Sequence, residues 1–189
     1  LVKPPCGEAL DAGISDSLVE LVDFYATAMD YAGVTPDHDH FGRSLRPIIG
    51  DRTKSVRDYV FCEGGRMEWE EQCDEYHSEG PEYDMHSEYW ARMKAQCNPL
   101  AHEKGTMICD GTYKYVERPS GANELYDLQN DPQEKINLYP RQKDSEVIQK
   151  MRLEMLKWYQ QTCDVVPKKY DNRFTEERVW ASVRKLCPA

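Results

Sequence analysis

Apolar residues recur at helical spacing in two long stretches of the chain. In Ser17–Ala32 they fall on one face, and Ser17 with Glu20 three residues later has the form of a capping box. Gly33 follows where a C-terminal glycine cap is expected. Ser145–Thr162 shows the same spacing. The first face consists of Leu18, Leu21, Val22, Tyr25, Ala28, Met29 and Ala32, and the second of Ile148, Met151, Met155, Trp158 and Tyr159. Both stretches are predicted to be helices that pack through these faces.

Runs rich in β-branched and aromatic residues predict a set of strands. They are Arg57–Cys62, Thr106–Cys109, Thr112–Glu117 and Glu124–Leu128. Asp110-Gly111 is a hairpin signal between the second and third runs, and Pro132 helps to end the last run because proline cannot donate to a ladder. Strands followed by a long helix indicate an α+β fold, with a small antiparallel sheet of three to four strands packed by the long C-terminal helix.

Two further helices are predicted in less regular parts of the chain. Ser87–Cys97 has apolar residues on one side and ends at Asn98-Pro99. A last helix begins at Thr175, where Glu176 and Glu177 suit the helix dipole. The residues Asp164–Phe174 before it are expected to be an extended tether.

The negative charge of the chain is concentrated in one segment. The 189 residues carry 34 acidic and 24 basic side chains, a net charge of −10. Ten acidic residues and one basic residue, Arg66, lie in Glu63–Glu88. This segment argues against nucleic acid or an anionic membrane as a partner there, and a solvated acidic loop is its ordinary interpretation. No apolar run is long enough to cross a bilayer.

Seven cysteines at irregular spacing form no known ligand or disulfide pattern. Because no C-x-x-C pair exists, a zinc site of that type is not expected. The odd number disfavours a disulfide framework, and mostly free thiols favour a reducing, cytoplasmic compartment. Leu1 in place of Met suggests a fragment, so the absence of a signal segment says little about the parent protein.

The segment Asn123–Leu138 reads NELYDLQNDPQEKINL. It resembles the ELYDLxxDPxExxNL signature near the C-terminus of the sulfatase family. Asp16–Val34 resembles the family's V-x-x-x-D-x-x-P-T-x-x-x-x-A-G helix with Ala26 in place of Pro, and Gly42–Ile49 resembles G-x-S-L-x-P-L-L. DYVFCEGG, TMICDGTYKYVER and KWYQQTCDVVP follow in family order. The chain therefore resembles the C-terminal portion of an arylsulfatase-like sulfatase of the alkaline-phosphatase superfamily.

The resemblance also indicates what the chain lacks. Sulfatases use a formylglycine nucleophile made within C/S-x-P/A-x-R, and the near match that starts at Cys97 has Ala101 where Arg is required. Their calcium site needs an early Asp-Asp pair and a later Asp-Asn pair. No Asp-Asp pair occurs, and Asp171-Asn172 comes too late. The resemblance implies that the parent uses calcium and formylglycine, while this segment is expected to hold no catalytic residue, metal ligand or cofactor.

Four residues are candidates for substrate binding because sulfatase loops after the Arg57–Cys62 strand approach the substrate pocket from the side. They are Arg66, Trp69, His77 and His86. Such side chains bind a sugar or aromatic group by stacking and hydrogen bonds. A surface loop or an interface contact is the more ordinary interpretation of this segment.

Two other clusters are weaker candidates for a metal site. Asp37-His38-Asp39-His40 crowds four ligand types into one turn, and adjacent residues seldom converge on one ion, so a polar turn is expected. Cys73, His77 and His86 match no known ligand spacing. No G-x-S-x-G nucleophile elbow occurs.

These observations predict four regions and one role. Residues 1–62 would be the tail of an α/β core with a helix and an edge strand, 63–105 an acidic insert with one helix, 106–167 an antiparallel subdomain with its packing helix, and 168–189 a tether and terminal helix. The expected role is that of a structural, pocket-walling part of a sulfuric ester hydrolase. Its partner would be the missing N-terminal catalytic part, and homo-oligomers through the exposed helix face are a further expectation. A parent that is a phosphodiesterase or phosphonate hydrolase and a free-standing binding or assembly module are the alternatives.

Overall fold

A computed structural model describes residues 1–67, 70, 102–163, 177 and 180–181 of the chain. It has two compact units, Leu1–Val60 with Arg152–Ala189, and Phe61–Met151. The predicted helix at Ser87–Cys97 lies outside the described residues. Of the predicted last helix, the structure describes Glu177, Trp180 and Ala181.

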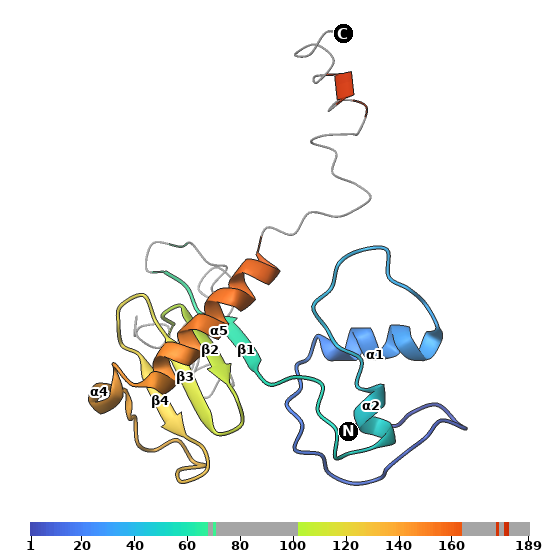
Figure 1. Cartoon of the computed structure of the whole chain (residues 1–189), viewed down its shortest axis with the longest axis horizontal. Coiled ribbons are helices and arrows are strands. Elements are labelled where there is room, and N and C mark those ends of the chain that lie inside the picture. The colour runs from blue at the N-terminus through green and yellow to red at the C-terminus, as the bar shows by residue number, and fades with distance from the viewer. Residues whose placement is uncertain (68–69, 71–101, 164–176, 178–179, 182–189) are drawn as a thin grey trace, which may run out of the picture. The chain divides into compact units, whose positions relative to one another are not determined.

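The second unit is built on a four-stranded sheet in the order β1-β2-β3-β4 (Figure 1). The strands are β1 (Val60–Gly64), β2 (Gly105–Cys109), β3 (Tyr113–Glu117) and β4 (Glu124–Asp127). β2 pairs with β3, and β3 with β4, in antiparallel register. The predicted α+β fold with its small sheet is therefore confirmed.

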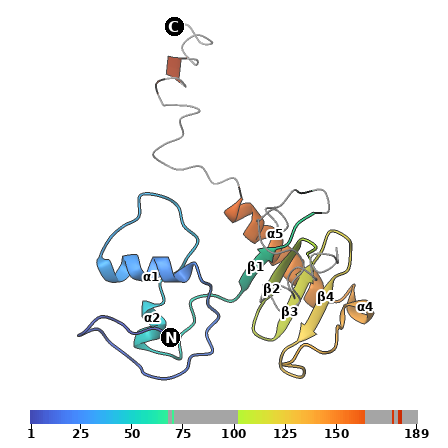
Figure 2. The ribbon, with the colours of Figure 1, turned by 180° about the vertical axis from the view of Figure 1, so that it is seen from behind.

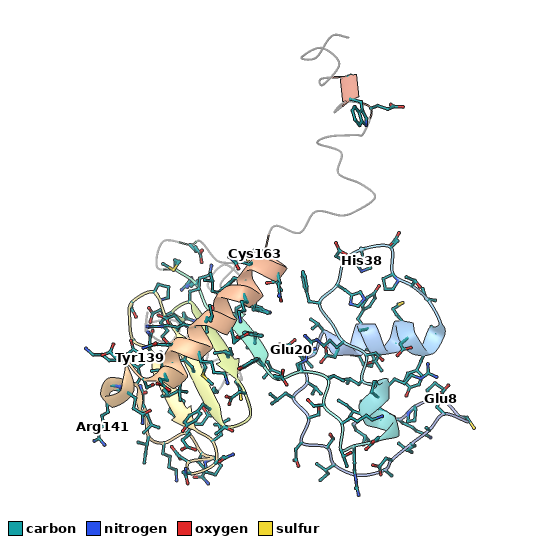
Figure 3. All side chains as sticks on the ribbon, viewed as in Figure 1. Glu8, Glu20, His38, Tyr139, Arg141 and Cys163 are labelled. Atoms are coloured by element: carbon teal, nitrogen blue, oxygen red, sulfur yellow. The ribbon has the colours of Figure 1, made fainter. Side chains whose placement is uncertain are left out.

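A row of three side chains across the sheet forms the centre of this unit. Ile108 is opposite Tyr115, and Tyr115 is opposite Leu125, and all three are fully buried. α5 (Glu146–Thr162) crosses one face of the sheet in both views (Figures 1 and 2). Its Ile148 and Met151 are buried, which confirms the apolar face predicted at the start of this helix. Tyr139 adds its ring 6.2 Å from that of Tyr115 (Figure 3).

The hairpin between β2 and β3 forms where Asp110-Gly111 predicted it. The Asp110 carboxylate accepts hydrogen bonds from the backbone N–H groups of Thr112 (2.9 Å) and Tyr113 (2.7 Å). Gly111 has φ +85°, a left-handed conformation that favours glycine. The connection is therefore one residue longer than the predicted two-residue turn, with glycine at its left-handed position.

α1 (Asp23–Ala32) begins six residues later than predicted. Its N-cap is Val22 with no side-chain cap, so the predicted capping box of Ser17 and Glu20 is wrong. The Asp23 carboxylate instead accepts the backbone N–H of Glu20 at 2.8 Å. Gly33, at φ +65°, ends the helix as predicted.

Two short helices, α2 (Arg46–Gly50) and α4 (Tyr139–Gln142), were not predicted. Each has a proline in its first turn, at Pro47 and Pro140. Proline suits this place because its fixed φ matches the helix and the first N–H groups have no partner within the helix. These short elements have too few residues for a periodic pattern to appear.

The apolar face predicted for α1 is partly exposed in the first unit, where Leu21, Val22, Ala28 and Ala32 are exposed and Tyr25 and Met29 are half-buried. α1 buries Asp23, Ala26 and Thr27. Leu21 and Phe24, in contrast, are 96% and 73% exposed. None of the three buried residues belongs to the predicted apolar face, so the prediction that α1 packs through that face is not confirmed within the described residues.

Candidate functional site

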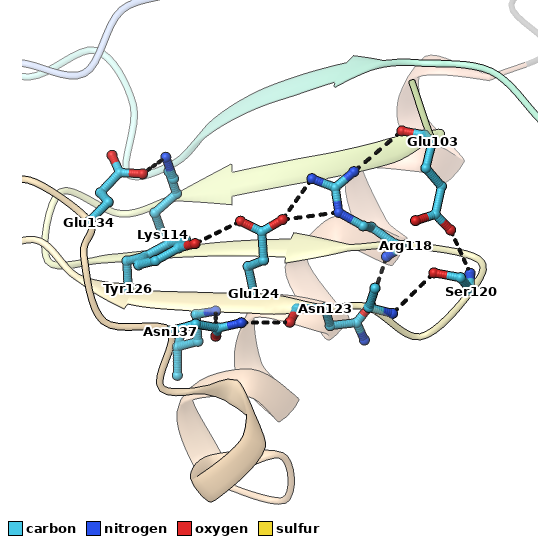
Figure 4. A network of polar contacts seen from close by, with 11 residues as sticks. Glu103, Lys114, Arg118, Ser120, Asn123, Glu124, Tyr126, Glu134 and Asn137 are labelled. Atoms are coloured by element: carbon cyan, nitrogen blue, oxygen red, sulfur yellow. Dashed lines mark hydrogen bonds and ion pairs between the residues drawn. The ribbon is translucent and has the colours of Figure 1, made fainter. Parts of the chain in front are cut away.

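The asparagine near the end of the Asn123–Leu138 segment closes the outer edge of β4. The Asn137 side chain accepts the Leu125 N–H (3.0 Å) and donates to the Asn123 carbonyl (3.2 Å), as Figure 4 shows in part. The Leu138 N–H donates to the Leu125 carbonyl at 2.8 Å. Asn137 therefore mimics the backbone of a neighbouring strand.

Three further polar side chains of this segment, those of Asn123, Asp127 and Asp131, also form hydrogen bonds within the fold. Asn123 is buried and accepts the Arg118 N–H (2.8 Å), while its amide donates to the Tyr115 hydroxyl (3.2 Å). The Asp127 carboxylate accepts the N–H groups of the two residues after Leu128, and that of Asp131 accepts the Ile136 N–H. The Asn123–Leu138 segment is therefore locked in place by hydrogen bonds of its Asn123, Asp127, Asp131 and Asn137 side chains within the fold.

A network of paired charges covers the sheet face opposite α5 (Figure 4). Lys114, Glu124 and Tyr126 lie on this face because side chains alternate along strands whose Tyr115 and Leu125 point to the core. Lys114 pairs with Glu134, and Arg118 pairs with Glu124 (2.7 Å). Two cations are thus matched by two carboxylates.

The network shifts the pKa values of Tyr126 and Glu124 in opposite directions. Burial and the hydrogen bond to Glu124 raise the pKa of Tyr126 to about 12. Burial alone would raise the pKa of Glu124, but hydrogen bonds from Arg118 and Tyr126 outweigh it and lower that pKa below its ordinary value. A phenol this weakly acidic beside a stabilised carboxylate is suited to fastening strands together and unsuited to proton transfer.

Arg66 is the one candidate substrate-binding residue that the structure describes, and it lies where the chain leaves β1. Its N–H donates to the His102 carbonyl (2.7 Å), and its carbonyl accepts the Lys104 N–H (3.0 Å). Gly65, at φ +77°, permits this approach, since an added Cβ would lie 2.3 Å from the Glu103 carbonyl oxygen. Arg66 therefore belongs to a clasp that joins the end of β1 to the residues before β2.

Two polar atoms at this clasp have no hydrogen-bond partner among the described residues. They are His102 Nε2 and Glu103 Oε2, and both are buried. The other Glu103 carboxylate oxygen accepts the Ser120 N–H (3.0 Å), and its carbonyl accepts from Arg118. His102 and Glu103 were not singled out from the sequence, because nothing in their spacing distinguishes them.

The other candidate substrate-binding residues, Trp69, His77 and His86, lie outside the described residues, as do Cys73 and Cys97. The described part of the chain therefore brings none of them together with Arg66. The histidines of the Asp37–His40 turn are described, and the rings of His38 and His40 lie 5.5 and 5.4 Å from the Tyr25 ring.

A buried ionic cluster in the first unit was missed by the sequence interpretation. Asp23 is fully buried and pairs with Arg57, which also pairs with Glu20. The same carboxylate accepts the Arg43 N–H at 2.8 Å. The signal was present, because Asp23 lies inside a helical pattern and is the aspartate of the family's helix motif, but that pattern alone does not name Arg57 as the partner.

The Gly42–Arg46 segment follows the polar side of α1. The Leu45 N–H donates to the Thr27 hydroxyl (2.9 Å), and Ser44 donates to Asp30. An added Cβ at Gly42 would lie 2.2 Å from the Val22 carbonyl oxygen. The two motifs that resemble the sulfatase helix and the G-x-S-L element therefore interlock through Asp23 and Thr27.

Neither a metal centre nor a membrane span emerges from the described part of the chain. Residues 1–67 and 102–163 contain no group of three or more His, Cys, Asp or Glu side chains placed to hold an ion. None of the described helices combines the length and the apolarity that a membrane crossing requires.

Comparison with protein-family models and with curated proteins gave no match. Solved structures do match. One, a complex with its substrate D-glucosamine-2-N,6-O-disulfate, aligns with a TM-score of 0.51 at 19% identity, over 78% of this chain and 25% of that one. The phosphonate monoester hydrolase of Silicibacter pomeroyi aligns with 0.51 at 18%, over 78% and 26%. A 2-O GAG sulfatase aligns with 0.49 at 23%, over 75% and 25%.

The chain thus spans about a quarter of the length of the solved structures that it matches. At identities this low, the alignments show that the fold is shared and show nothing about activity. At the level of fold the resemblance inferred from the sequence is confirmed, because the chain shares its fold with a part of the disulfated-glucosamine protein and with a part of a phosphonate monoester hydrolase.

Proposed function

We propose that this chain is the non-catalytic C-terminal portion of a hydrolase of sulfate esters. The observation that supports it is the fold shared over 78% of this chain with a quarter of a protein whose substrate is a disulfated glucosamine. The locked Asn123–Leu138 segment fits the same role, since its polar groups stabilise the fold and are not free for chemistry.

Within such a hydrolase the clasp around Arg66 would wall one side of the pocket. The Arg66 guanidinium is a bidentate donor suited to an anionic sugar, and His102 Nε2 has no partner among the described residues. Trp69, His77 and His86 would belong to the same wall. The partner would be the N-terminal catalytic part, which would supply the formylglycine nucleophile and the calcium.

A phosphonate ester is the alternative substrate of the parent. The alignment with a phosphonate monoester hydrolase is as good as that with the disulfated-glucosamine protein. The locked segment and the charged face of the sheet do not distinguish the two ester classes, so the assay must include both.

The test is an assay of the 189-residue chain, and of the same chain extended by the polypeptide encoded upstream, on an aryl sulfate and an aryl phosphonate monoester, with and without calcium. We expect no turnover by the chain alone and calcium-dependent sulfate release by the extended chain. Turnover by the chain alone would overturn the non-catalytic role, and release from the phosphonate ester alone would favour the alternative.

The pocket wall has its own test in the extended chain. Arg66→Ala should raise KM for an anionic sugar sulfate with little change in kcat, because the guanidinium contacts the substrate away from the reacting bond. Lys104→Ala, a charge change at the same clasp, is the matched control. Equal KM values for all three proteins would contradict a role for Arg66 in the wall.

A further inference from the structure

The hairpin between β2 and β3 contains an aspartate followed by a glycine, the sequence in which an aspartate most readily closes to a cyclic imide. Asp110-Gly111 is the single Asp-Gly pair in the 189 residues. Because glycine has no side chain, its backbone nitrogen can approach the carboxyl carbon of the preceding aspartate without a steric clash. The pair is therefore a chemically reactive point in an otherwise regular hairpin.

The reaction at such a pair needs only water. The Gly111 nitrogen attacks Cγ of Asp110, a carbon–nitrogen bond forms, and the amide proton leaves with the carboxyl hydroxyl group as water. Water then adds to the main-chain carbonyl carbon of Asp110, and the bond between that carbon and the nitrogen breaks. The product is an isoaspartate, in which the backbone runs through Cγ of residue 110 and is longer by a methylene group.

Hydrogen bonds within the native hairpin oppose the first step. The Asp110 carboxylate accepts the N–H groups of Thr112 (2.9 Å) and Tyr113 (2.7 Å), and the Asp110 N–H donates to the Tyr113 carbonyl (3.2 Å). The attacking nitrogen is also engaged, because the Gly111 N–H donates to Cys109 Sγ at 3.3 Å. Ring closure requires the side chain and the peptide plane after residue 110 to rotate, so these bonds must open first.

The modified backbone does not fit the pairing of the two strands. Cys109 is opposite Lys114, and Ile108 is opposite the fully buried Tyr115. Because the register of a hairpin depends on the length of its connection, an added methylene group displaces these partners from one another. Isoaspartate at residue 110 is therefore expected to destabilise the core of the unit Phe61–Met151.

We propose that Asp110 is a site of isoaspartate formation that the native hairpin protects, and that it reacts only in molecules whose hairpin has opened. The amount of isoaspartate then records how often the hairpin opens. The proposal uses only contacts within the hairpin, so it is independent of the hydrolase assignment.

Peptide mapping by mass spectrometry, with electron-transfer fragmentation to distinguish isoaspartate from aspartate, tests the proposal. The native 189-residue chain, the same chain in urea and a synthetic peptide of residues 106–115 are incubated at neutral pH. Isoaspartate at residue 110 should form at least roughly tenfold more slowly in the native chain than in the other two samples, because only the open fraction of native molecules reacts. Equal rates in the native chain and the peptide would overturn the proposal, as would a peptide that forms no isoaspartate.

The contact with the thiol has a test of its own. Cys109→Ala removes the acceptor of the Gly111 N–H and should raise the rate in the native chain roughly twofold to fivefold, the effect of a weak hydrogen bond on the open fraction. Cys62→Ala, at an exposed cysteine of β1, is the matched control and should react like the parent chain. A native Cys109→Ala chain that reacts no faster than Cys62→Ala would overturn the protective role of the thiol.

A third variant separates the lost contact from a general loss of stability. Cys109→Ser keeps an acceptor for the Gly111 N–H and should react more slowly than Cys109→Ala. General destabilisation would give the reverse order, because Cys109 is buried and a buried hydroxyl group costs more than a methyl group. In urea all the variants should react at the rate of the parent chain, and a faster Cys109→Ala chain there would also contradict a protective contact in the native hairpin.

Discussion

The fully buried side chains of the two units differ in kind, since those of Phe61–Met151 are apolar or aromatic and the one in Leu1–Val60 is the aspartate Asp23. Phe61–Met151 buries Ile108, Tyr115 and Leu125 and carries its charged pairs on the outer face of the sheet. Leu1–Val60 buries the pair of Asp23 and Arg57 and turns Leu21 outward. An apolar core loses stability in proportion to the volume removed, whereas a buried ion pair fails as soon as one member is missing. The stability of the first unit therefore depends on a few specific contacts.

The largest effect is expected from Arg57→Met. The substitution leaves the Asp23 carboxylate buried without its counter-charge, which should lower the free energy of unfolding of this unit by about 4 kcal/mol. Hydrogen exchange of the α1 amides measures it. Arg52→Met is the control, because Arg52 is a half-exposed arginine paired with Asp11, and it should lower the free energy of unfolding by less than about 1 kcal/mol. Unchanged protection of α1 in Arg57→Met would contradict a charged core.

The second-largest effect is expected from Leu125→Ala, which should destabilise the unit Phe61–Met151. Removing a fully buried side chain from the centre of the sheet should lower the free energy of unfolding by about 3 kcal/mol. Denaturant unfolding followed by tryptophan fluorescence measures the loss, and Ile136→Ala, at an exposed position, is the control. If both substitutions cost the same, the apolar row is not the core of this unit.

Asn137→Ala should lower the free energy of unfolding by about 2 kcal/mol, because it removes the side chain that bonds the Leu125 N–H and the Asn123 carbonyl. Thermal unfolding measures the change. Asn130→Ala is the matched control, because Asn130 is exposed and its amide contacts only the carboxylate of Asp127. An equal change in the unfolding temperature of the two variants would mean that the Asn137 side chain does not stabilise the edge of β4.

The smallest effect concerns alkaline pH. The folded pKa of Tyr126, about 12, lies above the ordinary value of 10, so the protonated phenol is favoured in the folded state. Its contribution is complete below pH 10 and is lost as the pH rises toward 12. The stability difference between the parent chain and Tyr126→Phe should therefore shrink across that interval. A difference that stays constant would show that the hydrogen bond to Glu124 does not set the pKa.

The sheet could be predicted closely from the sequence. β2, β3 and β4 begin or end within a residue of their predicted bounds, and α5 begins one residue late, because alternation and helical spacing are local properties. β1 is shifted from Arg57–Cys62 to Val60–Gly64. Arg57 instead joins the ionic cluster, and a β-prone run does not reveal such a long-range partner.

The candidate site was less predictable because its contacts are between residues far apart in the sequence. The cross-strand pair of Arg118 and Glu124 and the clasp of Arg66 with His102 depend on register. α1 illustrates the limit most clearly. Its periodicity did not identify the covered side, because that side is set by Arg43, Leu45 and Arg57, none of which the helix pattern contains.

The side chain of Asn137 has a consequence for how the sheet behaves in concentrated solution. An unpaired strand edge is a template on which another molecule can add a strand, the first step toward fibrils. At β4 this template is already occupied by the Asn137 amide and the Leu138 N–H. Asn137→Ala should therefore make the β4 edge available for the addition of a strand from another molecule.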